Sequence, residues 1–248
     1  MSQTLDRALL ILDFVAERPR RVNEVAAELK VHPSTALRLL HTLRRHGFVY
    51  ALDDHHYRLG SAMFRLGFQA LAGIDLRSVA MPQMEELNQL TGETVHLGVL
   101  GGDEVVYVEK VMAKHPVTMQ SRIGAIAPIH CTGVSKAILA YLPEDKRARL
   151  LSGRKFEPFT EFSLVTPAAL QADLDETRKR GFARDNQEHS LGIHCVAAPI
   201  LAGDDEVLGA FSVSAPVSRV DEKTLLSYVP ALKDAVRKTS EQFGWKSQ

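Results

Sequence analysis

The sequence contains few cysteines and no long hydrophobic run. Its 248 residues include only Cys131 and Cys195, too few for a disulfide framework. The longest apolar stretches fall far short of the roughly 20 residues that a membrane-spanning helix requires. The first seven residues lack the basic-then-apolar order of a secretory signal. These absences predict a cytoplasmic protein that has no membrane partner.

An excess of charge of either sign is also missing. The chain has 30 Lys and Arg against 30 Asp and Glu, which excludes a protein that coats nucleic acid through charge alone. Aromatic residues make up 6% of the chain and hydrophobic residues 45%. This composition is typical of a globular protein, and the length suffices for one large domain or two smaller ones.

The charges are distributed unevenly along the chain. Residues 1–60 contain 9 Lys and Arg against 7 Asp and Glu, and five of the ten histidines, whereas the remainder is slightly acidic. Between residues 32 and 52 the charged side chains are Arg38, Arg44 and Arg45. A small basic segment inside a neutral chain is a candidate for nucleic-acid binding.

Two amphipathic helices are predicted at the start of this segment. The apolar stripe expected to face the core of the first helix consists of Leu5, Ala8, Leu9, Leu12, Val15 and Ala16. Residues 18–20 interrupt this pattern. Asn23 is then the expected N-cap of a second helix, with Glu24 in its first turn, where the helix dipole favours an acid.

A third helix and a hairpin follow. Pro33 suits the first turn of the third helix, and Gly47 suits a left-handed residue just after its end. The expected buried stripe of this helix consists of Leu37, Leu40 and Leu43, flanked by Leu39. Residues 48–59 read as a β-hairpin with a polar tip. Residues 1–60 are therefore predicted to form a winged helix-turn-helix domain.

In a winged helix-turn-helix domain the third helix enters the major groove of DNA. Small hydroxyl side chains at its start permit close approach, and Arg38 is positioned to contact a guanine edge. Arg44 and Arg45, at the helix end, are better placed for phosphates. The predicted DNA-binding residues are Ser34, Thr35, Arg38, His41, Arg44 and Arg45. The alternative is a three-helix module that contacts another protein.

The rest of the chain is predicted to be α+β. Residues 61–75 are expected to form a linker helix that also pairs protomers, because helix-turn-helix proteins usually bind two-fold half-sites. In residues 76–248, strands are expected at 94–100, 105–109, 117–119, 194–200 and 207–214. Helices are expected at 82–90, 133–142, 144–152, 167–180 and 221–242. This pattern indicates an antiparallel sheet with helices on its flanks.

Motifs of the common enzyme classes are missing. There is no G-x-S-x-G elbow, no complete Walker A motif and no G-x-G-x-x-G. Metal-binding spacings such as C-x-x-C are missing too, although His130–Cys131 and His194–Cys195 form two His-Cys pairs. We therefore expect no catalysis, no cofactor and no metal. A redox switch through the two cysteines is an alternative that requires thiols of low pKa.

Several segments resemble the IclR family of bacterial transcriptional regulators, over nearly the whole chain. In the N-terminal part the similar segments are residues 22–26 and 34–43. In the C-terminal part they are residues 95–98, 122–125, 130–137, 188–199 and 209–214. Ser135 departs from the family, which usually has glycine before the lysine. The resemblance implies that the second domain is a GAF-like effector-binding domain.

The resemblance also implies that this domain binds a small organic molecule, often a carboxylate or an aromatic acid. The residues that match the family's binding site by position are Gly133, Val134, Asp185, Ile193, Cys195, Ser212 and Ser214. Taken singly, each of them is equally compatible with a packing or turn-forming role. The resemblance favours the binding role for the set as a whole.

The chemistry of these residues is compatible with such a ligand. Ser212 and Ser214 are two apart on a predicted strand, so their hydroxyls lie on one face, opposite Phe211 and Val213. The amides at a helix start near Gly133 suit a carboxylate. Because no arginine is among these positions, a bidentate carboxylate clamp is not expected.

These observations predict a ligand-responsive transcriptional regulator. As a homodimer or a dimer of dimers, it would bind a pseudo-palindromic double-stranded DNA operator, and a small organic effector would control that binding. The sequence leaves repression and activation equally open. The alternative function is a metabolite or redox sensor that acts mainly through protein contacts.

Overall fold

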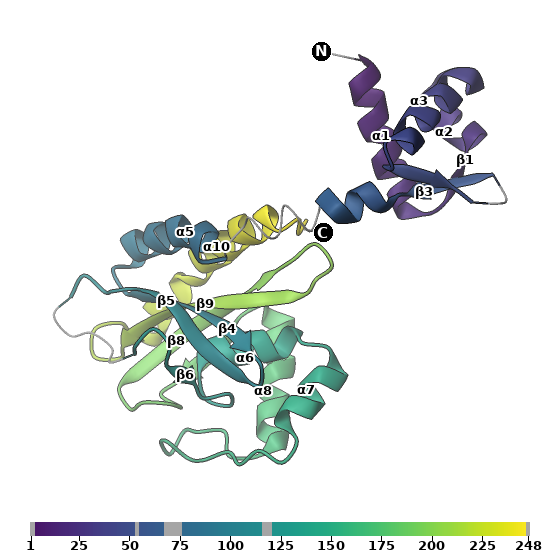
Figure 1. Cartoon of the computed structure of the whole chain (residues 1–248). Helices are drawn as coiled ribbons and strands as arrows, with labels where there is room; N and C mark the ends of the chain where they lie inside the picture. Colours follow the sequence, from purple (N-terminus) through teal and green to yellow (C-terminus); the bar gives the residue numbers. More distant parts are fainter. Residues whose placement is uncertain (1–2, 53–54, 67–75, 116–120, 247–248) are drawn as a thin grey trace. The chain divides into compact units, whose positions relative to one another are not determined.

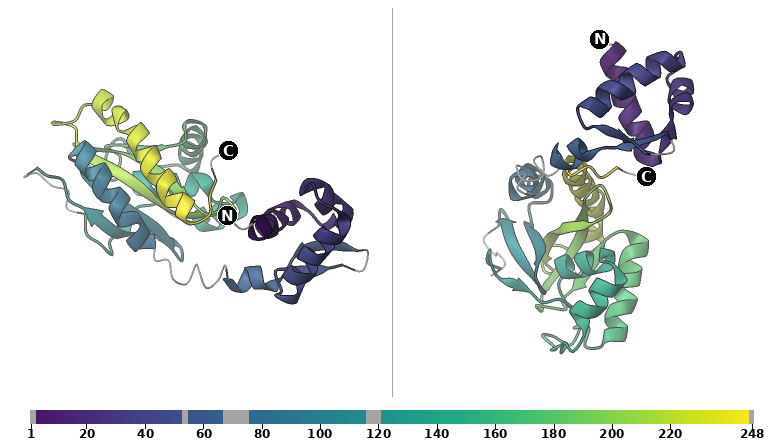
Figure 2. Two further views of the ribbon diagram at one scale, coloured as in Figure 1. Left: turned by 90° about the horizontal axis from the view of Figure 1, so that it is seen from above. Right: turned by 45° about the vertical axis from the view of Figure 1, so that its right-hand side comes forward.

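The computed structural model describes residues 3–52, 55–66, 76–115 and 121–246 (Figures 1 and 2). The chain divides into two compact units, residues 1–74 and 75–248, which are described separately below. Residues 61–66 are helical. The rest of the predicted linker helix, residues 67–75, lies outside the described residues, so the division into three segments stays a prediction.

The first unit is a winged helix-turn-helix domain, as predicted. Its helices are α1 (Gln3–Glu17), α2 (Val22–Glu28) and α3 (Pro33–Arg45). Its sheet contains the antiparallel strands β1 (Arg20–Arg21), β3 (His56–Leu59) and β2 (Val49–Ala51), in this spatial order. Strand β1 was not predicted, because two residues beside Pro19 carry no alternating pattern. It forms by pairing with β3, where Arg20 lies opposite Tyr57.

The predicted core faces of α1 and α3 are partly wrong. In α1, Ile11 and Val15 are buried, whereas Leu5 and Leu9 are more than half exposed. In α3 the buried side chains are Ala36, Leu39 and Leu40, and Leu37 lies at the surface. Both helices have leucines on more than one side, so spacing alone does not identify which side packs against the core.

Helix α2 begins earlier than predicted. Its N-cap is Arg21, not Asn23. The Glu24 carboxylate accepts a hydrogen bond of 2.8 Å from the Arg21 backbone N–H, and this capping interaction fixes the first turn around Val22. Glu24 therefore occupies the first turn, as predicted, but two positions further into the helix.

The end of α3 confirms the prediction for Gly47. This glycine has a φ of 75°, the left-handed conformation. The Phe48 N–H donates to the Leu43 carbonyl and the Gly47 N–H to the Arg44 carbonyl, each over 2.9 Å, which is a Schellman motif. A Cβ atom on Gly60 would lie 2.2 Å from the Gly47 carbonyl oxygen, so the wing returns closely onto this helix end.

The second unit contains one six-stranded antiparallel sheet, which confirms the α+β prediction. In spatial order its strands are β6 (Ile126–Ala127), β5 (Glu104–Val111), β4 (Thr94–Gly101), β9 (Val207–Pro216), β8 (Ile193–Leu201) and β7 (Ala183–Asn186). The four long strands lie where they were predicted. The short strands β6 and β7 were missed, and the strand predicted at 117–119 lies outside the described residues.

The helices of this unit are α5 (Leu76–Thr91), α6 (Gly133–Tyr141), α7 (Glu144–Leu151), α8 (Pro167–Arg180), α9 (Glu222–Ser227) and α10 (Val229–Gln242). Helix α5 begins before the predicted residue 82 and contains Pro82 in its interior. The helix predicted at 221–242 is divided at Tyr228, because Pro230 provides no N–H to continue α9. No helix in the described ranges is long and apolar enough to cross a membrane.

The sheet separates two layers of helices (Figure 1). Helices α5 and α10 lie side by side on one face and pack on Val95, Leu97, Phe211 and Val213. Helices α6 and α8 cover the other face, around Ala197 and Ala210. Because side chains alternate along a strand, the polar residues between these apolar ones lie on the α6 side.

A fully buried lysine joins the elements on the α6 side. Lys136 has no exposed side-chain surface, and its Nζ atom lies 2.7 Å from both carboxylate oxygens of Glu188 and 3.1 Å from Asp173 Oδ2. These contacts connect α6, α8 and the loop after β7.

Ser135 precedes this lysine in α6. Its hydroxyl donates to the Ala127 carbonyl over 3.1 Å, so a serine is accommodated where the family usually has glycine.

We predict that Lys136→Ala lowers the free energy of unfolding by about 3–5 kcal/mol, because Glu188 and Asp173 lose their buried counter-charge. Lys179→Ala is the matched control, since its ion pair with Glu176 is exposed and should matter little. Denaturant unfolding of the full chain measures both variants. Equal stability of the two would contradict the structural role of Lys136.

Candidate functional site

Helix α3 begins with an unusual cap. The Nδ1 atom of His32 accepts a hydrogen bond from the Ser34 backbone N–H over 3.3 Å, and the Ser34 hydroxyl lies 2.9 Å from the same nitrogen. Pro33 occupies the first turn, as predicted. The imidazole thus orders the exposed start of α3, and Ser34 is held in place there.

One face of α3 forms a shallow groove of about 390 Å³. It is lined by Ser34, Leu37, Arg38, His41, Thr42 and Arg45. Four of the six predicted DNA-binding residues therefore share this surface, which we call the α3 groove. All of its lining residues are exposed, and Leu37 is the one with an apolar side chain. The groove presents cations and hydroxyls, with no acid among its lining residues.

The other two predicted residues lie on neighbouring surfaces. Thr35 lines a groove of about 410 Å³ between α1 and α3, together with Thr4 and Arg7. Arg44 borders a larger hollow of about 910 Å³ at the base of the wing. Arg7 was not predicted as a site residue, because the amphipathic pattern of α1 gives no sign of which helix packs beside it.

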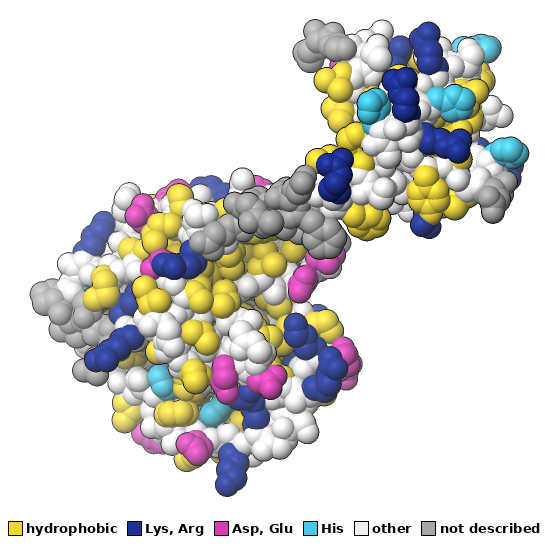
Figure 3. All heavy atoms as spheres, viewed as in Figure 1, with side chains coloured by type: hydrophobic (Ala, Val, Ile, Leu, Met, Phe, Trp, Pro, Cys, Tyr) yellow, Lys and Arg dark blue, Asp and Glu magenta, His cyan; other side chains and the backbone are white. Residues whose placement is uncertain are grey.

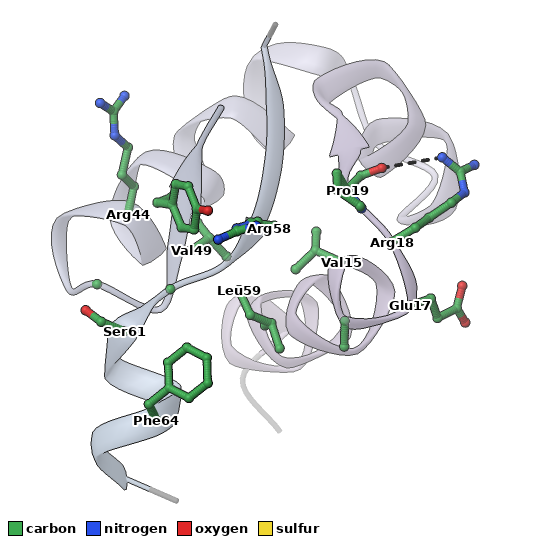
Figure 4. Close-up of a pocket in the computed structure, with 14 residues that line it drawn as sticks. Val15, Glu17, Arg18, Pro19, Arg44, Val49, Arg58, Leu59, Ser61 and Phe64 are labelled. Atoms are coloured by element: carbon green, nitrogen blue, oxygen red, sulfur yellow. Dashed lines mark hydrogen bonds between the residues drawn. The ribbon is translucent and has the colours of Figure 1, made fainter. Parts of the chain in front are cut away.

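Figure 4 shows the hollow at the base of the wing. Its walls include Val15, Val49 and Leu59, and Phe64 stands at its margin. The Arg44 side chain points away from the hollow. The Arg58 guanidinium lies 4.4 Å from the centre of the Tyr50 ring, a cation–π contact that orders it on the wing.

Positive charge therefore surrounds α3 and the wing. The face of the first unit visible in Figure 3 carries Lys, Arg and His much more than Asp and Glu. Arg58 was missed as a candidate, although its place in the predicted hairpin was a usable signal. The arrangement suits a polyanion that runs past α3 and the wing together.

The second unit brings most of the predicted effector-site residues into one polar cluster on the α6 side of the sheet. Across the strands, His96 lies opposite Ser212, and Ser214 lies opposite Cys195, which in turn faces Asp185. All five side chains are buried. Ser212 and Ser214 share this face, opposite Phe211 and Val213, as predicted.

His96 is the centre of this polar cluster and was not among the predicted residues. Its Nε2 atom lies 2.6 Å from the Ser121 hydroxyl, and its Nδ1 atom lies 3.4 and 3.5 Å from the Ser212 and Ser214 hydroxyls. Burial, helped by the charge of Lys110, lowers the pKa of His96 to about 3. The imidazole is therefore neutral near pH 7 and both donates and accepts hydrogen bonds.

Lys110 adds a positive charge that the predicted set lacked. It lies opposite His96 on β5, and its Nζ atom donates to the Ser121 carbonyl over 2.9 Å. Burial lowers the pKa of Lys110. His96 and Lys110 could have been found by extending the alternation of Ser212 and Ser214 to the neighbouring strands.

Asp185 lies at the other side of the cluster. Its Oδ1 atom accepts a hydrogen bond of 2.8 Å from the Glu188 N–H, and its Oδ2 atom lies 3.6 Å from Cys195 Sγ. Burial, reinforced by the charge of Glu188, raises the pKa of Asp185 to about 7. The carboxyl group therefore keeps its proton to a higher pH than an exposed aspartic acid does.

The remaining predicted residues border the cluster. A Cβ atom on Gly133 would lie 3.2 Å from Ala197 Cβ and 3.5 Å from Cys195 Cβ, so the start of α6 lies directly against β8. Val134 is buried against Gly98. Ile193, the first residue of β8, is half-buried and two positions from Cys195.

The thiols of the two cysteines are less reactive than exposed thiols. Burial raises the pKa of Cys131 to about 12 and raises that of Cys195 as well, with Asp185 adding to both shifts. A thiol in this state is a poor nucleophile, which disfavours the redox alternative. In the part of the chain that the structure describes, no three His, Cys, Asp or Glu side chains are grouped as metal ligands.

Two family models match the chain. The model described as "Bacterial transcriptional regulator IclR C-terminal" matches residues 68–241, and the one described as "IclR helix-turn-helix domain" matches residues 4–53. Together they cover most of both units. They agree with the resemblance that the sequence motifs indicated.

Full-length relatives are similar as well. The HTH-type transcriptional regulator XynR of Escherichia coli is 35% identical over 246 residues, 98% of either chain. The transcriptional repressor IclR of the same organism is 32% identical over 247 residues, 98% of this chain and 90% of the relative. Both names describe regulators of transcription.

Solved structures share the fold. A putative ICLR transcriptional regulator from Silicibacter sp. superposes with a TM-score of 0.84 at 26% identity, covering 99% of this chain and 97% of that one. The repressor BlcR of Agobacterium tumefaciens superposes with a TM-score of 0.78 at 25% identity, covering 100% and 99%. The similarity thus extends over both units.

We predict a stability difference between the wild type and Asp185→Asn that depends on pH. An acid whose pKa is 3.8 when unfolded and about 7 when folded binds its proton more tightly in the folded state. The free energy of unfolding of the wild type therefore falls as the pH rises from about 4 to 7, and Asp185→Asn removes this decrease. Thermal unfolding at several pH values measures the difference between the two proteins, with Asp145→Asn as the exposed control. Parallel curves for wild type and Asp185→Asn would refute the raised pKa.

Proposed function

Because the chain belongs to the IclR family of bacterial transcriptional regulators, we propose that α3 and the wing bind an operator and that the polar cluster binds the effector controlling it. The chain is a helix-turn-helix regulator and not an enzyme. The observation that carries the proposal is the α3 groove, a continuous surface of cations and hydroxyls on the helix that enters the major groove in this fold.

On the DNA side, the residues divide into two groups by position. Ser34, Arg38 and His41 line the α3 groove over the first turns of the helix, where base edges would lie. Arg44, Arg45 and Arg58 stand at the end of α3 and on the wing, which suits phosphates. A single head with so few cations binds weakly, so two heads of a dimer would engage the two halves of a pseudo-palindromic operator in the cytoplasm.

On the ligand side, the polar cluster favours a small carboxylate. Neutral His96 and the hydroxyls of Ser212 and Ser214 provide hydrogen bonds, while Lys110 provides one positive charge. These groups match a single carboxylate with an adjacent hydroxyl or keto oxygen. A dianionic ligand is disfavoured, because Asp185 and Glu188 border the same cluster.

Repression is the mode that the relatives support. Several relatives are named repressors, among them IclR and AllR of Escherichia coli and the acetate operon repressor of Salmonella typhimurium. In this mode the unliganded protein holds the operator and the effector releases it. A coupling free energy of about 1–3 kcal/mol suffices for a 5–150-fold change in operator affinity.

We predict that Arg38→Ala and Arg44→Ala weaken operator binding in different ways. Loss of a base contact at Arg38 should cost about 1–3 kcal/mol and relax discrimination at one base position. Loss of a phosphate contact at Arg44 should weaken binding to all sequences and reduce the salt slope by about one. Gel shifts with the protein's own upstream region at several salt concentrations distinguish them. An Arg38→Ala protein that retains full affinity and specificity refutes the assignment.

We also predict that Ser214→Ala combined with Asp185→Ala abolishes the effector response and leaves operator binding intact. A thermal-shift screen against small carboxylates and aromatic acids identifies the ligand, since a ligand at 100 times its Kd adds about 2.7 kcal/mol. Ser227→Ala with Asp145→Ala, both on exposed helices, is the control. A response that survives in the double variant of the polar cluster places the effector elsewhere.

A further inference from the structure

Leu37 is the apolar residue among the polar ones that line the α3 groove. The residue is 36% exposed, and it lines the groove together with Ser34, Arg38 and His41. The core of the first unit is filled from an adjoining side of the helix, by Ala36, Leu39 and Leu40, and Leu37 is not among the residues packed there. The packing of this unit therefore does not account for a large apolar side chain at position 37.

The position of Leu37 on the helix places it among the base-reading residues. Residues three and four apart share one side of an α-helix. Leu37 is three residues after Ser34 and four before His41, so it occupies the middle of the row that runs along the groove. Arg38 stands beside it. A helix that enters the major groove through this row brings Leu37 to the base edges along with Arg38.

The composition of α3 limits which base edges it can read by hydrogen bonds. Residues 33–45 contain no Asn, Gln, Asp or Glu. The bidentate amide contact with adenine and the carboxylate contact with the cytosine amino group are both missing. Arginine remains for guanine, beside the less selective hydroxyl and imidazole groups of this face. One further feature of the major groove is apolar, the 5-methyl group of thymine. Leu37 offers it a larger apolar surface than the single methyl group of Thr42 does.

We propose that Leu37 determines operator specificity by packing on a thymine methyl group next to the base pair that Arg38 contacts. Each half-site then contains a thymine that is recognised through its methyl group, and its A·T pair is read from the thymine rather than from the adenine. The proposal rests on the proposed function of α3 as the DNA-reading helix, and it adds a base identity and a specificity-determining residue.

The test removes the methyl group alone. An operator is first selected from random duplexes with the full-length wild type. Each thymine of a half-site is then replaced by deoxyuridine, one position at a time and symmetrically in both halves. We expect one position at which deoxyuridine weakens wild-type binding about fourfold per half-site, the ratio expected for burial of one methyl group. Leu37→Ala should bind thymine and deoxyuridine at that position equally well.

Control variants keep the result specific to Leu37. Ser34→Ala and Leu37→Met should both retain the preference for thymine, since one leaves Leu37 in place and the other keeps an apolar side chain of similar length. Circular dichroism checks that the variants fold. The wild-type series alone can overturn the proposal. It does so if deoxyuridine weakens wild-type binding at no thymine position. That result is expected if Leu37 instead packs on a partner protein.

Two other outcomes are equally decisive. A thymine preference that persists undiminished in Leu37→Ala assigns the methyl contact to a different residue and overturns the proposal. A wild type that binds no duplex at any salt concentration contradicts the proposed function itself, which is distinguishable from binding without dependence on the methyl group.

Discussion

The ion pair between the buried Lys136 ammonium group and Glu188 is the interaction on which the architecture of the second unit depends. The ammonium group holds Glu188 at 2.7 Å, and the backbone N–H of Glu188 in turn binds Asp185 over 2.8 Å. Asp185 contacts Cys195 on β8, against which the start of α6 is packed. One ion pair thus fixes the position of α6 relative to the polar cluster. Because both partners are buried, removing Lys136 would leave the Glu188 carboxylate without its counter-charge.

The second constraint is the pleat of the sheet, which directs alternate side chains of a strand to opposite faces. On β4 and β9 the residues facing α5 and α10 are apolar and fully buried, including Leu97 and Phe211. The residues between them carry the imidazole of His96 and the hydroxyl of Ser212 to the other face. The α6 face of the sheet can therefore tolerate a polar cluster among its apolar residues, since the other face contributes a separate apolar core.

How much the sequence predicts depends on which physical signal each element carries. The long strands and α6 to α8 were predicted because alternation and spacing are local. Strands β6 and β7 exist only through pairing with β5 and β8, which a sequence pattern does not encode. The predicted faces of α1 and α3 were partly wrong for a different reason: both helices have leucines on more than one side, and tertiary packing determines which of them are buried. The same error concealed Leu37, whose exposure is visible only in the folded domain.

The candidate sites follow the same division. Ser212 and Ser214 were placed on the correct face by their spacing, but the raised pKa of Asp185 and the neutral state of His96 arise from burial, which no local pattern reports. On the DNA side, the net charge of zero limits how much binding energy can come from phosphates. A regulator of this kind must obtain its selectivity from base contacts, and each contact is worth only about 1–3 kcal/mol. Under the proposed function, the few residues of the α3 groove, duplicated in the two heads of a dimer, would supply this selectivity.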